Sequence, residues 1–120
     1  MWVMQRGDGM VVVRTEPGHL QGNLGDNVHG GAILTQADIA MFVCARLNGA
    51  LQHGPGATLD LHSHFMGAGQ VGLPMDAEVE ILKETGRLLF LRGLVKQQGH
   101  SICAFTGTIR KMSPPRGERT

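Results

Sequence analysis

A glycine-rich stretch at residues 23–31, with the sequence Asn-Leu-Gly-Asp-Asn-Val-His-Gly-Gly, contains groups that could polarise a carbonyl. His29, Gly30 and Gly31 stand where an apolar segment begins, at the predicted first turn of a helix. The first N–H groups of a helix lack intrahelical partners and lie at the positive end of its dipole. Two glycines there let a ligand approach the bare backbone, which suits a developing oxyanion or a phosphate. The same glycines could serve only to let the loop turn, and both readings stay open at this point.

An aspartate, Asp38, interrupts the apolar segment two turns into the predicted helix. A helix that is apolar nearly all round is a core helix, and burying an ionised carboxylate without partners costs several kcal/mol. Such groups concentrate at functional sites or in paired networks. The sequence therefore predicts that Asp38 is a buried functional carboxylate. The polar side chains between residues 32 and 47 are Thr35, Gln36, Asp38 and Arg46.

Gly30 and Asp38 are too far apart on one helix to act on the same small group. Eight residues correspond to about 12 Å of helix, whereas a catalytic group must lie within hydrogen-bonding reach. Two copies of the helix running antiparallel would bring Asp38 of one subunit to Gly30 of the other. The spacing thus predicts a two-fold homodimer with composite sites.

Periodicity and turn residues predict five strands and one helix. Residues 1–8 show no clear pattern and are expected to form a frayed or weakly paired start. The helix should stop at Asn48-Gly49, because these residues tolerate the left-handed conformation that ends helices. The expected elements are a strand at 10–14, the helix at about 31–48, and strands at 58–65, 74–83, 88–97 and 101–110.

Residues 58–65 alternate in polarity, which predicts a strand with one buried face. That face would carry Leu59, Leu61, Ser63 and Phe65, and the other Thr58, Asp60, His62 and His64.

An antiparallel meander with a single helix must wrap that helix in its concave face, because no other element can cover either surface. The expected fold is α+β, with an antiparallel five- to six-stranded sheet wrapped around one long central helix. We expect one domain at residues 1–112 and a disordered tail at 113–120, where Pro, Gly and charge prevail.

Composition argues against several classes of function. The net charge is +1, no basic cluster is longer than Arg110-Lys111, and there are four Phe, one Trp and no Tyr, so we expect no binding to nucleic acid. Cys44 and Cys103 are predicted to be reduced core thiols. No signal peptide is visible at the N-terminus, so a cytoplasmic location is expected. The apolar segment is too short and too polar to predict a membrane span.

The ordered spacing of several residues resembles a known family. Asn23 stands six residues before His29, and Asp38 stands nine residues after it; the meander then opens with Ala-Thr-Leu-Asp at residues 57–60. This pattern is similar to the hotdog-fold acyl-CoA thioesterases of the phenylacetic-acid-degradation (PaaI-like) group. The resemblance spans about residues 10–110, and the ordered set is far more specific than His-Gly-Gly alone.

The resemblance implies a hydrolase of acyl-CoA or aryl-CoA thioesters that needs no metal or redox cofactor. The N–H of Gly30 would polarise the thioester carbonyl, and His29 would help to hold the carbonyl or the loop. Asp38 of the partner subunit would act as general base on water or as nucleophile, and the sequence does not separate these roles. Thr58 stands where this group places a hydroxyl that orients water, and Asn23 where an amide contacts water or the leaving group.

Other assignments rest on weaker signals. Asn27 competes with Asn23 for the amide role. Gly31, Arg87 and Lys83 are expected to bind substrate, with Arg87 the first candidate for a CoA phosphate; the other basic candidates are Lys96, Arg110 and Lys111. His62 and His64 share a strand face with Asp60, a spacing compatible with a metal, but no third or fourth ligand is evident and none is predicted. A dimer of dimers is a further expectation.

Two other functions fit a hotdog domain. The hydratase and dehydratase group carries a motif that resembles Asp-x-Asn-Pro-x-His; Asp26 and His29 are spaced by three instead of five, and the proline is absent. A non-catalytic acyl-CoA-binding or regulatory module would need no buried acid, so Asp38 argues against it.

Overall fold

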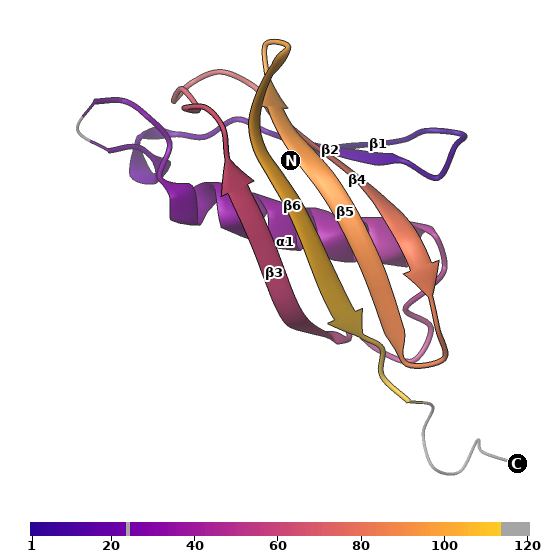
Figure 1. The fold of residues 1–120 in the computed structure, drawn as a ribbon. Coiled ribbons are helices and arrows are strands. Elements are labelled where there is room, and N and C mark those ends of the chain that lie inside the picture. Colours follow the sequence, from indigo (N-terminus) through magenta and orange to yellow (C-terminus); the bar gives the residue numbers. More distant parts are fainter. Residues whose placement is uncertain (24, 114–120) are drawn as a thin grey trace, which may run out of the picture.

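One long helix lies against a curved antiparallel sheet of six strands in the part of the chain described by the computed structural model, residues 1–23 and 25–113 (Figure 1). The strands follow one another across the sheet in the order β1-β2-β4-β5-β6-β3, and a short 3-10 helix, η1, precedes the loop before α1. The elements are β1 (Trp2–Gln5), β2 (Val11–Thr15), η1 (His19–Gln21), α1 (Gly30–Leu47), β3 (Ala57–Phe65), β4 (Met75–Glu84), β5 (Leu88–Gln97) and β6 (His100–Arg110).

Of the two alternatives expected for the start of the chain, frayed or weakly paired, the structure shows a paired strand, β1, which is antiparallel to β2. All four β1 residues are exposed, so no buried face marks this strand in the sequence. The Trp2 ring lies opposite Arg14, whose guanidinium carbon is 5.2 Å from the ring centroid. This cation–π contact and the strand pairing hold β1 at one edge of the sheet. The expected tail beyond Ser113 lies outside the described residues.

The helix α1 begins and ends close to its predicted limits, and Gly49 adopts the expected left-handed conformation, with φ of 73°. By length and composition alone, with a mean hydropathy of 1.2, this helix could cross a membrane. It packs instead on the sheet as a core helix, through one side only, and Ile39 on the outer side is 43% exposed. The buried side consists of Ile33, Gln36, Ala37, Ala40, Met41, Cys44 and Ala45.

The prediction of a buried face on β3 was also wrong, since all but one of its nine residues are exposed. The strand lies at the sheet edge with β6 as its sole neighbour in the described sheet. A β-bulge between Thr58 and Asp60 interrupts the alternation. It moves Thr58 to the helix-facing side, opposite the buried Ile109, and leaves Leu59 52% exposed. An alternating pattern predicts two faces, but it does not identify what covers them.

Both cysteines are free and buried, as expected. Burial raises the pKa of the Cys44 thiol to about 11, and it also raises the pKa of Cys103. A thiol that resists ionisation is a poor nucleophile. The two cysteines therefore belong to the core and not to a reactive site.

Close packing between β4, β5 and β6 requires a glycine at position 93. A Cβ there would touch the Phe105 ring and lie 2.6 Å from the backbone oxygen of Glu78. We expect Gly93→Val to destabilise the fold by about 2–3 kcal/mol, because the strand backbone cannot move aside. Gly7→Ala, at a turn position with nothing within 4 Å, is the control and should leave the urea midpoint unchanged. Equal midpoints for the two variants would contradict this account.

Candidate active site

The N-terminus of α1 presents backbone donors that nothing in the described part of the chain uses. The N–H groups of Ala32 and Ile33 donate to the carbonyl oxygen of His29 at 3.0 and 3.2 Å, whereas those of Gly30 and Gly31 have no acceptor among the described residues. A Cβ at Gly30 would lie 3.4 Å from the Phe65 ring, and one at Gly31 would meet nothing within 4 Å. The space in front of Gly31 is therefore open to a ligand. Two free amides at the positive end of a helix can stabilise an oxyanion.

Asn23 shapes the loop that leads to these donors. Its side-chain oxygen accepts hydrogen bonds from the N–H groups of Gly25, at 2.9 Å, and Asn27, at 3.2 Å. The backbone N–H of His29 donates to the carbonyl of Gln21 at 2.7 Å, which fixes the entry into the helix. The side-chain oxygen of Asn23 is thus committed to the loop. A contact with water or with a leaving group would have to come from its NH2 group, and this role stays a prediction.

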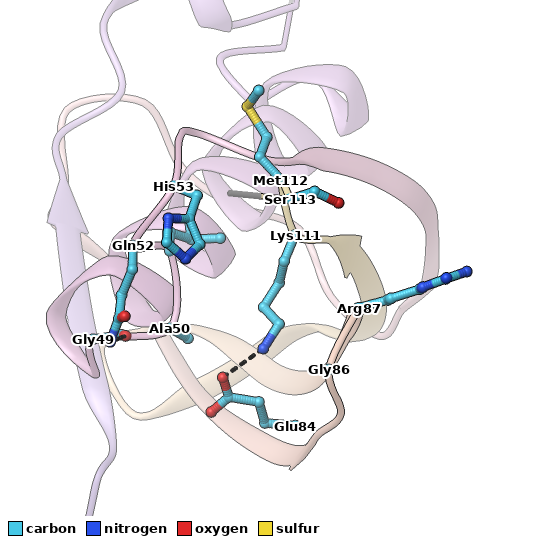
Figure 2. Close-up of a pocket in the computed structure, with 11 residues that line it drawn as sticks. Gly49, Ala50, Gln52, His53, Glu84, Gly86, Arg87, Lys111, Met112 and Ser113 are labelled. Carbon is cyan, nitrogen blue, oxygen red and sulfur yellow. Dashed lines mark hydrogen bonds and ion pairs between the residues drawn. The ribbon is translucent and has the colours of Figure 1, made fainter. Parts of the chain in front are cut away.

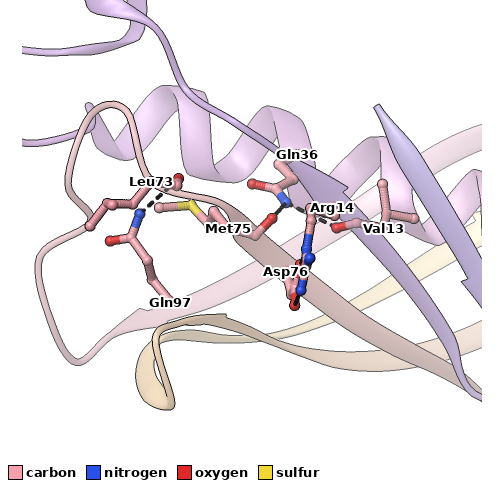
Figure 3. Close-up of polar contacts among 7 residues, drawn as sticks. All are labelled: Val13, Arg14, Gln36, Leu73, Met75, Asp76 and Gln97. Carbon is pink, nitrogen blue, oxygen red and sulfur yellow. Dashed lines mark hydrogen bonds and ion pairs between the residues drawn. The ribbon is translucent and has the colours of Figure 1, made fainter.

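A second loop, residues 66–74, is joined to the glycine-rich loop by backbone hydrogen bonds. Val28 N–H donates to the carbonyl of Gly69 at 2.8 Å, and Val71 N–H donates to that of Asp26 at 3.0 Å. The buried side chain of Gln97 fixes this second loop by donating to the carbonyl of Gln70 at 2.9 Å and to that of Leu73 at 3.1 Å. Figure 3 shows the bond to Leu73. Gln97 therefore positions the helix N-terminus indirectly: its side chain holds the loop at 66–74, and backbone hydrogen bonds from that loop hold the glycine-rich loop.

Asp38 lies at the β3 side of the helix and accepts a hydrogen bond of 2.7 Å from the Thr58 hydroxyl. It is partly exposed in the single chain, so the expectation of a buried Asp38 was wrong. The bulge in β3 explains the pairing, because it turns Thr58 toward the helix. A carboxylate beside a hydroxyl, both open to solvent, can hold a water molecule and accept its proton.

The two halves of the candidate site lie at opposite ends of β3. Gly30 packs under Phe65 at one end, and Asp38 bonds Thr58 at the other. Gly30 and Asp38 stand two turns apart on α1, and neither can reach a reacting atom bound by the other within one chain. The chain therefore carries two separate half-sites.

The sequence model of the acyl-CoA thioesterase N-terminal domain matches residues 20–112, which include both half-sites. The chain belongs to this family of hotdog-fold thioesterases. No curated protein sequence is similar enough to count as a match.

Solved structures support the hotdog fold. A mutant of the phenylacetic acid degradation protein PaaI from Thermus thermophilus is 22% identical, with 92% of each chain covered and a TM-score of 0.79. A hypothetical thioesterase from Streptococcus pneumoniae, solved with coenzyme A, is 22% identical over 95% of this chain and 90% of its own, with a TM-score of 0.80. Zebrafish thioesterase superfamily member 2 is 21% identical over 92% and 80%, with a TM-score of 0.79. The predicted fold and family resemblance are thus confirmed.

Basic residues of this thioesterase-family chain gather at the sheet end nearest Thr58. Arg87 lines two adjoining hollows of about 510 and 480 Å³, together with Lys111. Lys111 is paired with Glu84 at 2.8 Å, while Arg87 extends away from that pair (Figure 2). Lys83 lines neither hollow, so the structure does not bring it to the same place. Lys96 is paired with Glu78 at 3.2 Å.

An apolar pocket of about 230 Å³ lies beside the first turns of the central helix. Val28, Ala32, Ile39 and Met75 supply its apolar lining. A cavity of about 150 Å³ holds a benzene ring, so this pocket could hold a single ring or a short chain. The sequence did not single it out, because its lining comes from four separate segments.

Gln36 was not singled out from the sequence either, yet it is the buried polar side chain of the helix, at 6% exposure. Its amide donates to the carbonyl oxygens of Val13 and Met75 at 3.2 and 2.8 Å, and so joins α1 to β2 and β4 (Figure 3). The apolar pattern had instead singled out Asp38 as the side chain that is costly to bury, and Asp38 is only partly buried.

The described residues of one chain contain no group of three or more His, Cys, Asp and Glu side chains that could hold a metal ion.

Proposed function

We propose that this protein is a cytoplasmic hydrolase of acyl-CoA or aryl-CoA thioesters that works as a two-fold homodimer. The observation that carries the proposal is the separation of two half-sites to opposite ends of β3. One consists of the helix amides of Gly30 and Gly31, which have no acceptor among the described residues, and the other is the Asp38–Thr58 pair. A two-fold axis near the middle of β3 would place each half-site of one chain against the other half-site of its partner. Two such dimers would assemble back to back or face to face as a tetramer.

The exposed edge of β3 is the surface that would pair. An unpaired strand edge is a template for another strand, and β3 offers nine residues at the edge of the described sheet. Antiparallel pairing with a second copy would join two sheets into one. It would also run the two α1 helices antiparallel, as the composite site requires.

In this arrangement the thioester carbonyl oxygen accepts hydrogen bonds from the N–H groups of Gly30 and Gly31. The partner's Asp38 takes a proton from a water molecule that Thr58 helps to orient, and the water oxygen bonds to the carbonyl carbon. Collapse of the tetrahedral intermediate breaks the C–S bond, and the CoA thiolate leaves and is protonated. If Asp38 instead attacks directly, a mixed anhydride forms and water then cleaves it. His29 and Asn23 would support the carbonyl and the leaving group.

The nucleotide half of CoA would lie toward Arg87, on the chain that supplies Asp38. Two features support this: the basic hollow adjoins Ala57, the residue before Thr58, and the related protein from S. pneumoniae was solved with coenzyme A. Gly31 would line the approach of the thioester on the other chain.

Replacing Arg87 by alanine should raise KM for CoA thioesters about fivefold to tenfold with little change in kcat, because a phosphate contact far from the carbonyl acts on binding. The same variant should leave the hydrolysis of N-acetylcysteamine thioesters unchanged, since these lack the nucleotide. Arg6→Ala, an exposed arginine of the β1–β2 turn that lies 4.0 Å from Asp8, is the control. An equal effect of Arg87→Ala on both substrate types would contradict phosphate recognition.

A steady-state assay with a panel of thioesters tests the proposal as a whole. We expect hydrolysis, with short-chain and single-ring acyl groups preferred over long chains because the apolar pocket is small. Binding of CoA without hydrolysis of any thioester would show instead a non-catalytic binding module. Sedimentation at the assay concentration must show a dimer or a larger assembly, and an active monomer would rule out composite sites.

A further inference from the structure

Two histidines project from the face of β3 that points away from α1. His62 pairs with Thr106 of β6, and His64 pairs with Ala104, whereas the intervening Ser63 pairs with the buried Phe105. Both histidines are exposed and line a groove of about 390 Å³ on this outer face of the sheet. Asp60 shares the face, opposite Thr108.

These side chains are too few for a metal site in one chain. Pairing of β3 with the β3 of a second copy would double the number of possible ligands on this face. The inference rests on the proposed dimer. Thr58 and Phe65 mark the two half-sites, and the residues midway between them are Leu61 and His62. A two-fold axis that joins unlike half-sites must therefore pass beside β3, between it and the partner's β3, level with Leu61 or His62.

Side chains directly opposite each other in an antiparallel pair lie on the same face of the sheet. With Leu61 at the axis, each His62 would lie opposite Asp60 of the partner subunit. With His62 at the axis, the two copies of His62 would face each other, and with Ser63 there, each His62 would face the partner's His64. Each of these registers thus brings the two copies of His62 close together on the outer face, and the register with Ser63 at the axis adds both copies of His64. Opposed Cβ atoms lie about 5 Å apart and diagonal ones about 7–8 Å.

We propose that the homodimer binds one divalent transition-metal ion of the Zn²⁺ class at this two-fold axis, through His62 of both chains and, according to the register, Asp60 or His64 of both chains. Neutral imidazoles and carboxylates are the ligands that such ions prefer, and Zn²⁺ takes four of them. Arg92, a basic residue that also lines the groove, is paired with Glu80 at 2.6 Å. The ion would lie on the opposite side of the sheet from Asp38 and would tie the two subunits together.

Cobalt(II) binding to the full-length protein, with any affinity tag removed, tests the site at pH 7.5. We expect about one Co²⁺ per two chains and the visible absorption of a four-coordinate ion. The double variant His62→Gln/His64→Gln should weaken binding at least about tenfold, since second-shell losses alone already reach that size. His100→Gln, an exposed histidine at the start of β6, should bind as the wild type does. Saturating Zn²⁺ should lower the dimer dissociation constant by at least about tenfold in the wild type only.

Sedimentation of the same samples separates the two proposals. A dimer that hydrolyses thioesters but binds no Co²⁺, or binds it equally after the double substitution, would overturn the metal site and leave the proposed function intact. A protein that stays monomeric with and without metal would overturn both the composite active site and the shared metal site.

Discussion

Replacing Asp38 by asparagine should lower kcat for thioester hydrolysis by about 10²–10⁴-fold, the usual contribution of a general base, with a much smaller change in KM. The substitution keeps the shape of the side chain and the oxygen that accepts the Thr58 hydroxyl, so the half-site should stay folded. It removes the negative charge, and an amide can neither accept a proton from water nor attack a carbonyl carbon. The loss is therefore expected for either proposed role of Asp38. The measurement is steady-state hydrolysis of the best thioester in the panel.

Asp8→Asn makes the same chemical change in the β1–β2 turn, where the carboxylate accepts a hydrogen bond from the N–H of Met10. This variant should keep wild-type kcat. Thermal unfolding of both variants checks that the fold is retained. Wild-type turnover in Asp38→Asn would exclude the base and the nucleophile roles together.

The sequence pointed to Asp38 as a functional residue because a carboxylate interrupts an apolar run. The prediction that this carboxylate is buried, however, was wrong for the single chain. The helix buries one side only, and Asp38 lies at the border of that side, where Thr58 can reach it. The buried polar residue is Gln36, and its two carbonyl partners lie on strands 23 and 39 residues away along the chain. Hydropathy along one helix cannot identify such partners, because they depend on which strands cross over it.

Elements with strong local signals were predicted within a few residues, since period and turn residues are local properties. The two edge strands were not described correctly. β1 has no buried face, and the bulge in β3 reverses the face of Thr58. The hydrogen bonds of Gln97 could not be predicted from the sequence, because their acceptors are backbone carbonyls of a loop. Any residue type supplies such a carbonyl, so the sequence does not show which ones Gln97 reaches. Thr58 and Asn23 entered only through family resemblance, as neither type is unusual in its segment.

A mixed dimer of two inactive variants should recover activity, because each half-site would come from a different chain. Gly31→Val is the second variant: its Cβ meets nothing within 4 Å, so the chain should fold while the branched side chain fills the space before the helix amides. In a dimer of one Asp38→Asn chain and one Gly31→Val chain, one site keeps both Asp38 and Gly31, and the other site loses both. Purified through two different tags, this mixed dimer should show about half of the wild-type kcat per dimer, since a two-fold dimer has two equivalent sites.

The matched control is a mixed dimer of Asp38→Asn and Asp38→Ala, which damages the same half-site in both chains and should stay inactive. Recovery restricted to the first pair can arise only if Asp38 and the helix amides act across the interface, because a site within one chain would be damaged in every subunit of both mixtures. Equal inactivity of the two mixed dimers would therefore place catalysis within a single chain. That result would require a different partner for Asp38 than the helix N-terminus of a second copy, and it would remove the reason for placing a two-fold axis near His62.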